Sequence, residues 1–231
     1  MLNYPKVQIL DHGYVQFVES WGSDERIVES ARMSTDKGFL GWDKDEGFLK
    51  YLYDHKHLTP FEMAGMTLEI KAPIFVFREW HRHRTMSYNE MSARYIPLPD
   101  ENYVPSVERL LRGANTATSN KQAQGINEVT LTEEQAIHWL ELLNESYAIA
   151  QHVYDYGLKL GIPKELARLP VPVARYSRMR VSCNLRNWLA FLALREAQDA
   201  QYEIRVFANE VCNLIVQHFE RTAFLYNSNK K

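Results

Sequence analysis

Cysteine is scarce in this 231-residue sequence, and the charges of the two signs nearly cancel. Cys183 and Cys212 are the only cysteines and form no CxxC pair, which predicts two reduced core thiols rather than a disulfide framework or a zinc site. The 27 basic residues oppose 29 acidic ones, for a formal net charge of -2. Proteins that bind nucleic acids or membrane surfaces in general usually carry a basic excess, so any anion bound here must be met locally.

Long apolar runs and glycine-rich phosphate loops are also missing. The longest apolar run, Trp188 to Leu194, is far short of the roughly 20 residues that a bilayer span needs. The first ten residues do not pair a charged start with an apolar stretch, so we expect a cytoplasmic protein. The ten glycines form neither GxxxxGK[ST] nor GxGxxG, so a nucleotide would have to be held by side chains.

The hydrophobic patterns predict an α+β fold with an antiparallel or mixed sheet and packed helices, as one domain over residues 1–231. Alternation predicts strands over residues 6–13, 14–22, 66–72 and 176–183. Helical spacing predicts helices over residues 23–34 and 42–57, with Ser23 and Asp43 as their caps, and over residues 74–84 after Pro73. The capping box of Thr132 and Gln135 predicts the start of a long helix, and Pro163 predicts the start of a short one. Two further helices are predicted between residues 188 and 219. Residues 85–95 should form a loop, and residues 113–130 a polar excursion without chemistry of their own.

Arginines gather in two segments that hold few carboxylates. Residues 166–195 contain six arginines and no Asp or Glu, and the stretch RHRTMSYNEMSARY at residues 82–95 adds three more, just after Arg78. Guanidinium groups are permanently charged, fork-shaped donors for phosphate, so this separation favours anion binding. The alternative is that these arginines are solvated or paired with carboxylates distant in the sequence.

Other patterns are weaker. The histidine pairs 55/57 and 81/83 lack the spacing of a metal site, so we expect no bound metal. Ser87, Ser92 and Ser182 could each be a nucleophile, yet none lies in a GxSxG elbow and the sequence places no base beside one. Hydrogen bonding is the favoured role for all three.

The motif RHRTMSYNEMSAR matches RHRxxSxNExSxR at every specified position, and the sequence closely resembles the flavin-dependent thymidylate synthases. ARMSTD, HLTPFE, KAPIFVFREWHRHR, ELARLPVPVARYSR, NLRNWLAFLALR and AQYEI extend the resemblance over nearly the whole chain. It implies a homotetramer with sites shared between subunits, which methylates dUMP by using FAD, NADPH and methylenetetrahydrofolate.

The resemblance also implies roles for individual residues. FAD would be bound by Ser34, Thr59, Arg82, His83, Arg84, Glu90, Asn184, Leu185 and Arg186. The nucleotide would be bound by Glu79, Trp80, His81, Arg82, Glu90, Met91, Ser92, Ala93, Arg94, Arg168 and Arg195. Arg195 corresponds to the catalytic arginine that activates the uracil; Ser92 corresponds to a proposed nucleophile, which we interpret as a hydrogen-bond donor.

Two residues depart from the family pattern. Glu79 replaces a frequent glutamine, and a carboxylate near phosphate is unfavourable unless paired, for which Arg78 and Arg82 are the predicted partners. Ala190 replaces a frequent polar flavin contact, which would weaken FAD binding.

Two alternatives to thymidylate synthesis stay open. One is a related flavin-dependent enzyme that hydroxymethylates a pyrimidine nucleotide. The other is an RNA-binding module that reads phosphates with its arginines and stacks bases on Tyr88 and Tyr95.

Overall fold

A five-stranded antiparallel sheet organises the computed structural model, which describes residues 4–115 and 130–230. The strand order is β1-β2-β3-β5-β4, with β1 Lys6–Ile9, β2 Gly13–Trp21, β3 Gly65–Pro73, β4 Ser87–Glu90 and β5 Tyr176–Asn184. The predicted α+β class and antiparallel pairing are confirmed. The predicted polar excursion at 113–130 lies almost wholly outside the described residues.

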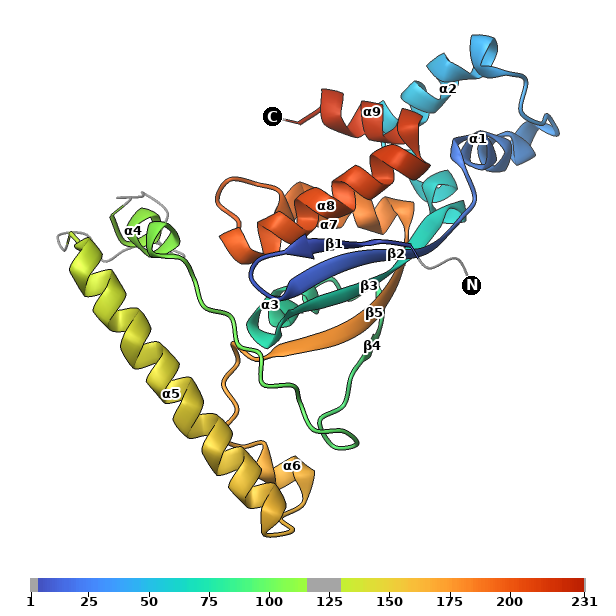
Figure 1. Ribbon diagram of the computed structural model, residues 1–231. Coiled ribbons are helices and arrows are strands. Elements are labelled where there is room, and N and C mark those ends of the chain that lie inside the picture. The colour runs from blue at the N-terminus through green and yellow to red at the C-terminus, as the bar shows by residue number, and fades with distance from the viewer. Residues whose placement is uncertain (1–3, 116–129, 231) are drawn as a thin grey trace.

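The alternation that predicted the strands also determines which face of the sheet is covered. Met66, Leu68 and Ile70 of β3 are fully buried, as is Val181 of β5. The helices α3 (Ile74–Trp80), α7 (Leu185–Arg195) and α8 (Tyr202–His218) pack on the sheet, and α7 and α8 lie together over one face (Figure 1). Both cysteines are free and buried, as predicted.

Residues 81–95 differ from the prediction. Helix α3 opens after Pro73 as expected but ends at Trp80 rather than Arg84, and β4 forms inside the predicted loop. Strand β4 pairs with β5 from Ser87↔Ser182 to Glu90↔Met179. A short polar segment has little intrinsic strand preference, so its conformation comes from the free edge of β5.

Three helices form a cluster at one end of the sheet: α1 (Asp24–Arg32), α2 (Trp42–Asp54) and α9 (Glu220–Ser228) (Figure 1). The short 3-10 turn η1 (Met33–Thr35) follows α1 within this cluster, and a second one, η2 (Thr59–Met63), lies between α2 and β3. Ser23 caps α1 as predicted, but Asp43 does not cap α2: Gly41 is the cap residue and Asp43 lies in the first turn. Helix α9 was not predicted.

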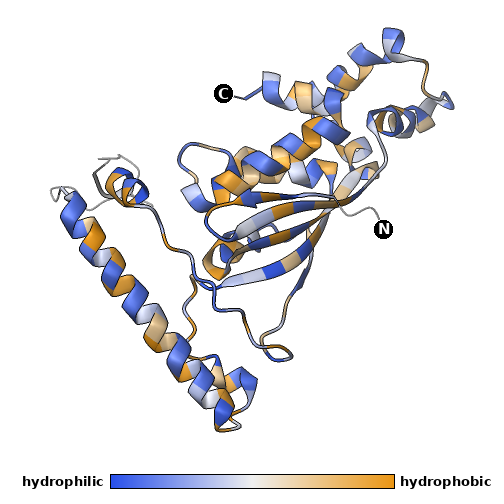
Figure 2. Cartoon of the chain, viewed as in Figure 1, coloured by the Kyte–Doolittle hydropathy of each residue, from blue (hydrophilic) through white to orange (hydrophobic). Residues whose placement is uncertain are grey.

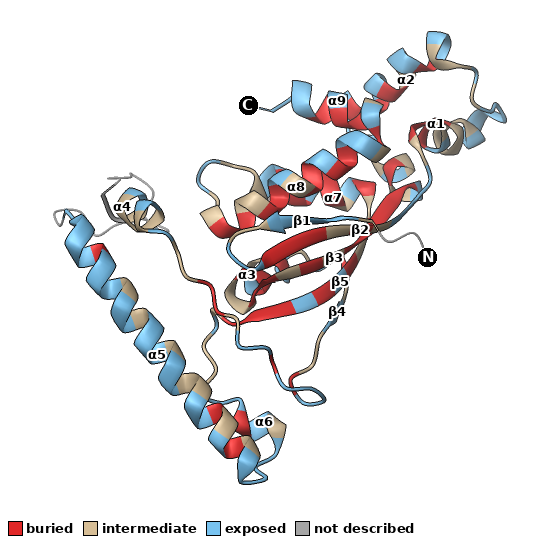
Figure 3. Cartoon of the chain, viewed as in Figure 1, coloured by how far each residue is buried: buried red, intermediate tan, exposed pale blue. Residues whose placement is uncertain are grey.

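Helices α4 (Val107–Asn115), α5 (Glu133–Lys159) and α6 (Lys164–Ala167) form an arm that stands away from the sheet (Figure 1). The capping box at Thr132 and Gln135 and the short helix after Pro163 are confirmed. Helix α5 alternates hydrophobic and hydrophilic residues along its length (Figure 2), yet most of it is exposed (Figure 3). Its exposed apolar residues include Leu142, Ile149, Val153, Tyr156 and, just beyond its end, Leu160.

Candidate functional site

Arg195, at the last position of α7, is held by groups at the end of α3. Its Nη1 lies 2.7 Å from Glu79 Oε2, its Nη2 donates to the Glu79 carbonyl at 3.0 Å, and its Nε donates to His83 Nε2 at 2.9 Å. The Arg195 side chain is only 16% exposed. Glu79 is therefore paired with Arg195, and the prediction that it pairs with Arg78 or Arg82 is wrong.

His83 is a neutral side chain in this arrangement. Burial, together with the charge of Arg195, lowers the pKa of His83 to about 4, although Glu79 acts in the opposite direction. Its ring packs edge to face on Phe191 with centroids 4.9 Å apart. An uncharged imidazole can accept the Arg195 bond, whereas an imidazolium could not.

The lowered pKa of His83 predicts an acid-sensitive fold. The unfolded chain takes up this proton near pH 6.5 and the folded chain only near pH 4, so the free energy of unfolding falls as the pH decreases across that interval. We expect His83→Gln to show a shallower fall between pH 6.5 and 4, measured by denaturant unfolding at one fixed protein concentration. His138→Gln, on the exposed surface of α5, is the matched control. Equal slopes for His83→Gln and the parent would contradict the prediction.

A cavity of about 500 Å³ lies beside the end of β4. It is lined by the second half of the motif RHRTMSYNEMSAR (residues 82–94), which we call the signature. Glu90, Met91, Ser92 and Ala93 line it together with Arg168, as the resemblance implied. Arg78, Ile74, Leu98, Leu169, Val171, Pro172, Val173 and Ser177 complete the wall. Arg78 was missed as a lining residue, although its place one turn before the signature's first arginine was a usable signal.

Within this cavity, Ser92 has no base to activate it. The Ser92 Oγ accepts a hydrogen bond from the Arg94 backbone N–H at 3.3 Å, and no carboxylate or imidazole bonds to it among residues 4–115 and 130–230. Arg94 itself forms an ion pair with Glu165 on α6. The geometry thus favours Ser92 as a hydrogen-bonding group.

The predicted flavin residues of α7 gather at its N-terminus. Asn184 caps α7 by accepting from the Asn187 N–H at 3.0 Å, and Arg186 forms an ion pair with Glu62 of η2, the turn that begins at Thr59. Leu185 is fully buried and its N–H donates to the Ala64 carbonyl at 2.7 Å, so its side chain belongs to the core.

Other predicted residues are spread around these groups. His81, Arg82 and Arg84 are exposed on the turn between α3 and β4, and Ser34 is exposed with its hydroxyl donating to the Ala31 carbonyl. Trp80 is fully buried and stacks on Phe191. Any ligand contact of Trp80 would therefore come from its main chain.

The arginine-rich segments contain few carboxylates, but the fold brings carboxylates from other segments next to some of these arginines. Arg175, Arg180, Arg186 and Arg195 pair with Asp100, Glu69, Glu62 and Glu79 respectively. Arg78, Arg82, Arg84 and Arg168 form no ion pair within the described parts of the chain. The four unpaired guanidinium groups lie on or next to the signature, where an anion would meet them.

The predicted site residues lie in three places: the Arg195 cluster, the cavity beside β4 and the N-terminus of α7. The signature contributes to the first two of them. No hydrogen bond or ion pair links Arg195 to Ser92 or Arg168 among the residues that the structure describes. Arg195 and Arg186 lie at opposite ends of α7.

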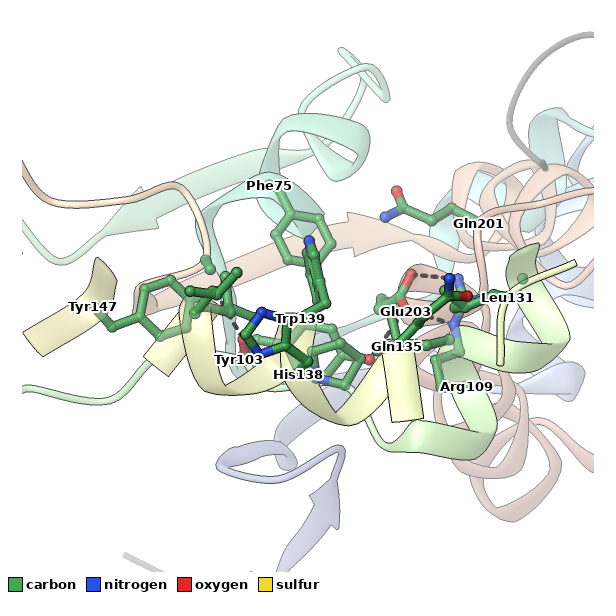
Figure 4. Close-up of a pocket in the computed structure, with 16 residues that line it drawn as sticks. Phe75, Tyr103, Arg109, Leu131, Gln135, His138, Trp139, Tyr147, Gln201 and Glu203 are labelled. Carbon is green, nitrogen blue, oxygen red and sulfur yellow. Dashed lines mark hydrogen bonds and ion pairs between the residues drawn. The ribbon is translucent and has the colours of Figure 1, made fainter. Parts of the chain in front are cut away.

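Another cavity, of about 880 Å³, lies between the α4–α5 arm and the body of the protein (Figure 4). Phe75, Tyr103 and Trp139 contribute aromatic rings to it, and the ion pair between Arg109 and Glu203 closes one end. None of the predicted site residues lines this cavity.

The fold defines an α+β protein whose signature segment carries hydroxyl groups and, at Arg82 and Arg84, guanidinium groups without ion-pair partners in the described chain, and no glycine-rich phosphate loop occurs in its sequence. Residues 16–219 match the family described as Thymidylate synthase complementing protein. The flavin-dependent thymidylate synthase of Wolbachia pipientis wMel is 39% identical over 212 residues, which cover 92% of this chain and 72% of that protein. The one from Rickettsia bellii (strain RML369-C) is 37% identical over 227 residues, covering 92% and 74%.

A solved structure agrees with these sequence relatives. The UMP/dUMP methylase PolB from Streptomyces cacaoi, bound with 5-Br dUMP, aligns with a TM-score of 0.83 at 30% identity over 97% of this chain and 98% of that one. The chain belongs to the flavin-dependent thymidylate synthase family, and it is an enzyme.

Proposed function

We propose that this chain methylates dUMP to dTMP, with FAD as its flavin, NADPH as reductant and methylenetetrahydrofolate as one-carbon donor. The observation that carries the proposal is the position of the signature. Its first half contributes His83 to the Arg195 cluster, and its second half lines the cavity of Ser92 and Arg168. One continuous segment thereby supplies both a group for a uracil ring and a group for a phosphate.

The nucleotide phosphate suits the cavity at β4. Arg78 and Arg168 line it without ion pairs in the described chain, and Ser92 adds a hydroxyl. Guanidinium forks match phosphate oxygens, and charged hydrogen bonds of this kind are roughly twice as strong as neutral ones. We assign Glu90, Met91, Ala93 and Arg94 to the same nucleotide.

The donor groups also fit FAD. Arg82 and Arg84 are exposed and without ion pairs in the described chain, which suits a diphosphate, and Thr59, Asn184 and Arg186 surround the start of α7. Arg186 would exchange Glu62 for the ligand. When bound, the flavin supplies the hydride chemistry, so the protein residues supply orientation and charge.

Arg195 provides electrostatic stabilisation in this scheme. Three of its N–H groups hold Glu79 and His83, and the guanidinium has about five N–H donors in all, so two are left for a uracil carbonyl. A preorganised donor of this kind stabilises the negative charge that develops on the ring in the transition state.

The experiment is an anaerobic incubation of the protein with dUMP, methylenetetrahydrofolate, FAD and NADPH, followed by mass analysis of the nucleotide. A gain of one methyl group supports the proposal, and a hydroxymethyl group would establish the related hydroxymethylating activity instead. Omission of each component tests the cosubstrates, and the flavin absorption of the purified protein tests FAD. No flavin binding and no modified nucleotide would refute the proposal.

Tyr88, one of the two tyrosines on which the RNA-binding alternative would stack bases, is already engaged by contacts within the fold. The Tyr88 hydroxyl donates to the carbonyls of Trp80 and His83, and its ring packs against His81. Tyr95 is 75% exposed, but it would have to act alone.

The exposed face of α5 supports a homotetramer with shared sites. Ile149, Val153 and Tyr156 are 65%, 48% and 57% exposed and lie at helical spacing on one stripe. An apolar stripe of this kind marks a protein–protein contact, and we assign it to a second copy of the chain. None of the described helices is long and apolar enough to cross a membrane; a cytoplasmic location is part of the proposal.

We expect light scattering to give the mass of a tetramer for the parent protein and a smaller species for Ile149→Asp. A buried carboxylate at that stripe would be desolvated without a partner. Asn144→Asp, on exposed surface of the same helix, is the control and should keep the tetramer. Loss of activity together with assembly would support shared sites, whereas a fully active monomer would exclude them.

A further inference from the structure

Glu79 gives Arg195 two acceptors from one residue. The carboxylate lies 2.7 Å from Nη1 and the main-chain carbonyl 3.0 Å from Nη2, so the guanidinium plane is fixed against the end of α3. The third hydrogen bond of the Arg195 guanidinium is donated by Nε to His83 Nε2 at 2.9 Å. Glu79, Arg195 and His83 therefore form one hydrogen-bond chain between α3 and α7.

We propose that Glu79 is a positioning residue rather than a substrate contact: it orients Arg195 and, through Arg195, holds His83 in the tautomer with its proton on Nδ1. The proposal deepens the proposed function and rests on it for the role of Arg195. It changes the role that the resemblance implied for Glu79, which was direct binding of dUMP.

The tautomer of His83 follows from the identity of its hydrogen-bond donor, which is Arg195. Arginine stays protonated in proteins and has no acceptor, so the His83 Nε2 that faces it must carry a lone pair. A neutral imidazole then has its proton on Nδ1. That N–H has no partner among the described residues, so it is a neutral donor available to a ligand.

Charge balance argues against Glu79 as a phosphate or carbonyl contact. A carboxylate repels phosphate and accepts nothing from a uracil oxygen. Beside Arg195 the same carboxylate compensates a guanidinium that is only 16% exposed. Its second bond, through the main chain, survives any substitution of the side chain, so the loss of the carboxylate should loosen Arg195 without releasing it.

The test compares Glu79→Gln with Glu79→Ala. The glutamine side chain keeps an oxygen that can accept from Nη1, so it should rescue the orientation. We expect Glu79→Ala to lower kcat about tenfold, in line with the cost of a misplaced catalytic group, with KM for dUMP changed less than about twofold. Glu79→Gln should stay within about threefold of the parent in kcat. Glu29→Gln, which removes a carboxylate from an exposed pair with Arg26, is the control and should leave both constants unchanged.

A second readout does not depend on activity. Nitrogen chemical shifts of ¹⁵N-labelled histidine in the ligand-free protein at pH 7.5 report the tautomer, and His83→Gln identifies the signal. The parent and Glu79→Gln should show the proton on Nδ1, and Glu79→Ala should gain the Nε2-protonated form.

Two results would overturn the proposal: a rise in KM alone for Glu79→Ala, which indicates a substrate contact, or a parent protein with the His83 proton on Nε2. A parent that makes no dTMP would sink the proposed function instead, while the nitrogen shifts would still decide whether Glu79 controls His83.

Discussion

Arg195→Ala is expected to lower the turnover of dUMP on the order of a hundredfold or more, while flavin content and assembly should stay those of the parent. The guanidinium is preorganised by Glu79 and His83, and the loss of one such donor typically costs about 2.7 to 4 kcal/mol of barrier. Steady-state dTMP formation at saturating dUMP is the measurement. Flavin absorption and light scattering on the same sample separate a chemical effect from misfolding.

Ser92→Ala is the matched comparison, because it distinguishes electrostatic activation from nucleophilic attack. Among the described residues, the Ser92 hydroxyl has only the Arg94 N–H as a hydrogen-bond partner, so its loss should mostly weaken dUMP binding and reduce turnover far less than Arg195→Ala does. If Ser92→Ala abolishes turnover with dUMP still bound, and Arg195→Ala stays near the parent, the two roles are reversed and Ser92 is the nucleophile.

Asp24→Ala is expected to lower the free energy of unfolding by about 2 to 3 kcal/mol. Asp24, in the first turn of α1, accepts from the Thr222 hydroxyl at 2.6 Å and from the backbone N–H groups of Arg221 and Thr222 at 2.9 and 3.3 Å. It thereby caps α9, whose own N-terminal residue Phe219 offers no side-chain cap. Burial raises the pKa of Asp24, and this desolvation keeps the net effect moderate.

Asp43→Ala is the control for Asp24→Ala, because the sequence predicted a cap at Asp43 and the structure places it, exposed, in the first turn of α2. It should cost no more than about 0.5 to 1 kcal/mol, the usual value of an acidic residue near a helix N-terminus. Denaturant unfolding at equal protein concentrations measures both. Equal losses for the two variants would show that Asp24 contributes only helix-dipole stabilisation.

Local sequence signals were sufficient to predict those helices and strands whose determining contacts lie within the element itself. Ser23 and the Thr132–Gln135 box predicted their helices because a cap acts over three residues. Alternation in β3 and β5 predicted their buried faces because the side-chain period of a strand is two. In the same way, the motif from Arg82 to Arg94 can be read from the sequence because its donors are consecutive.

Long-range partners were not accessible to the same reasoning. Strand β4 forms because β5 offers it an edge, and α9 begins where Asp24, 197 positions earlier than Arg221, supplies acceptors. Glu79 and Arg195 are 116 positions apart, so the sequence suggested only the nearby Arg78 and Arg82 as partners of Glu79, and that prediction was wrong.

The sequence by itself determined the class of the fold, the family resemblance and the arginine-rich composition of the site, since these depend on periodicity and on a contiguous motif. Only the tertiary structure decided which arginines are neutralised and which stay free for anions. It also decided that His83 is neutral, because burial and the Arg195 charge act on it through space. Pairing and burial depend on distances that the folded chain creates, and these have no counterpart in the order of residues.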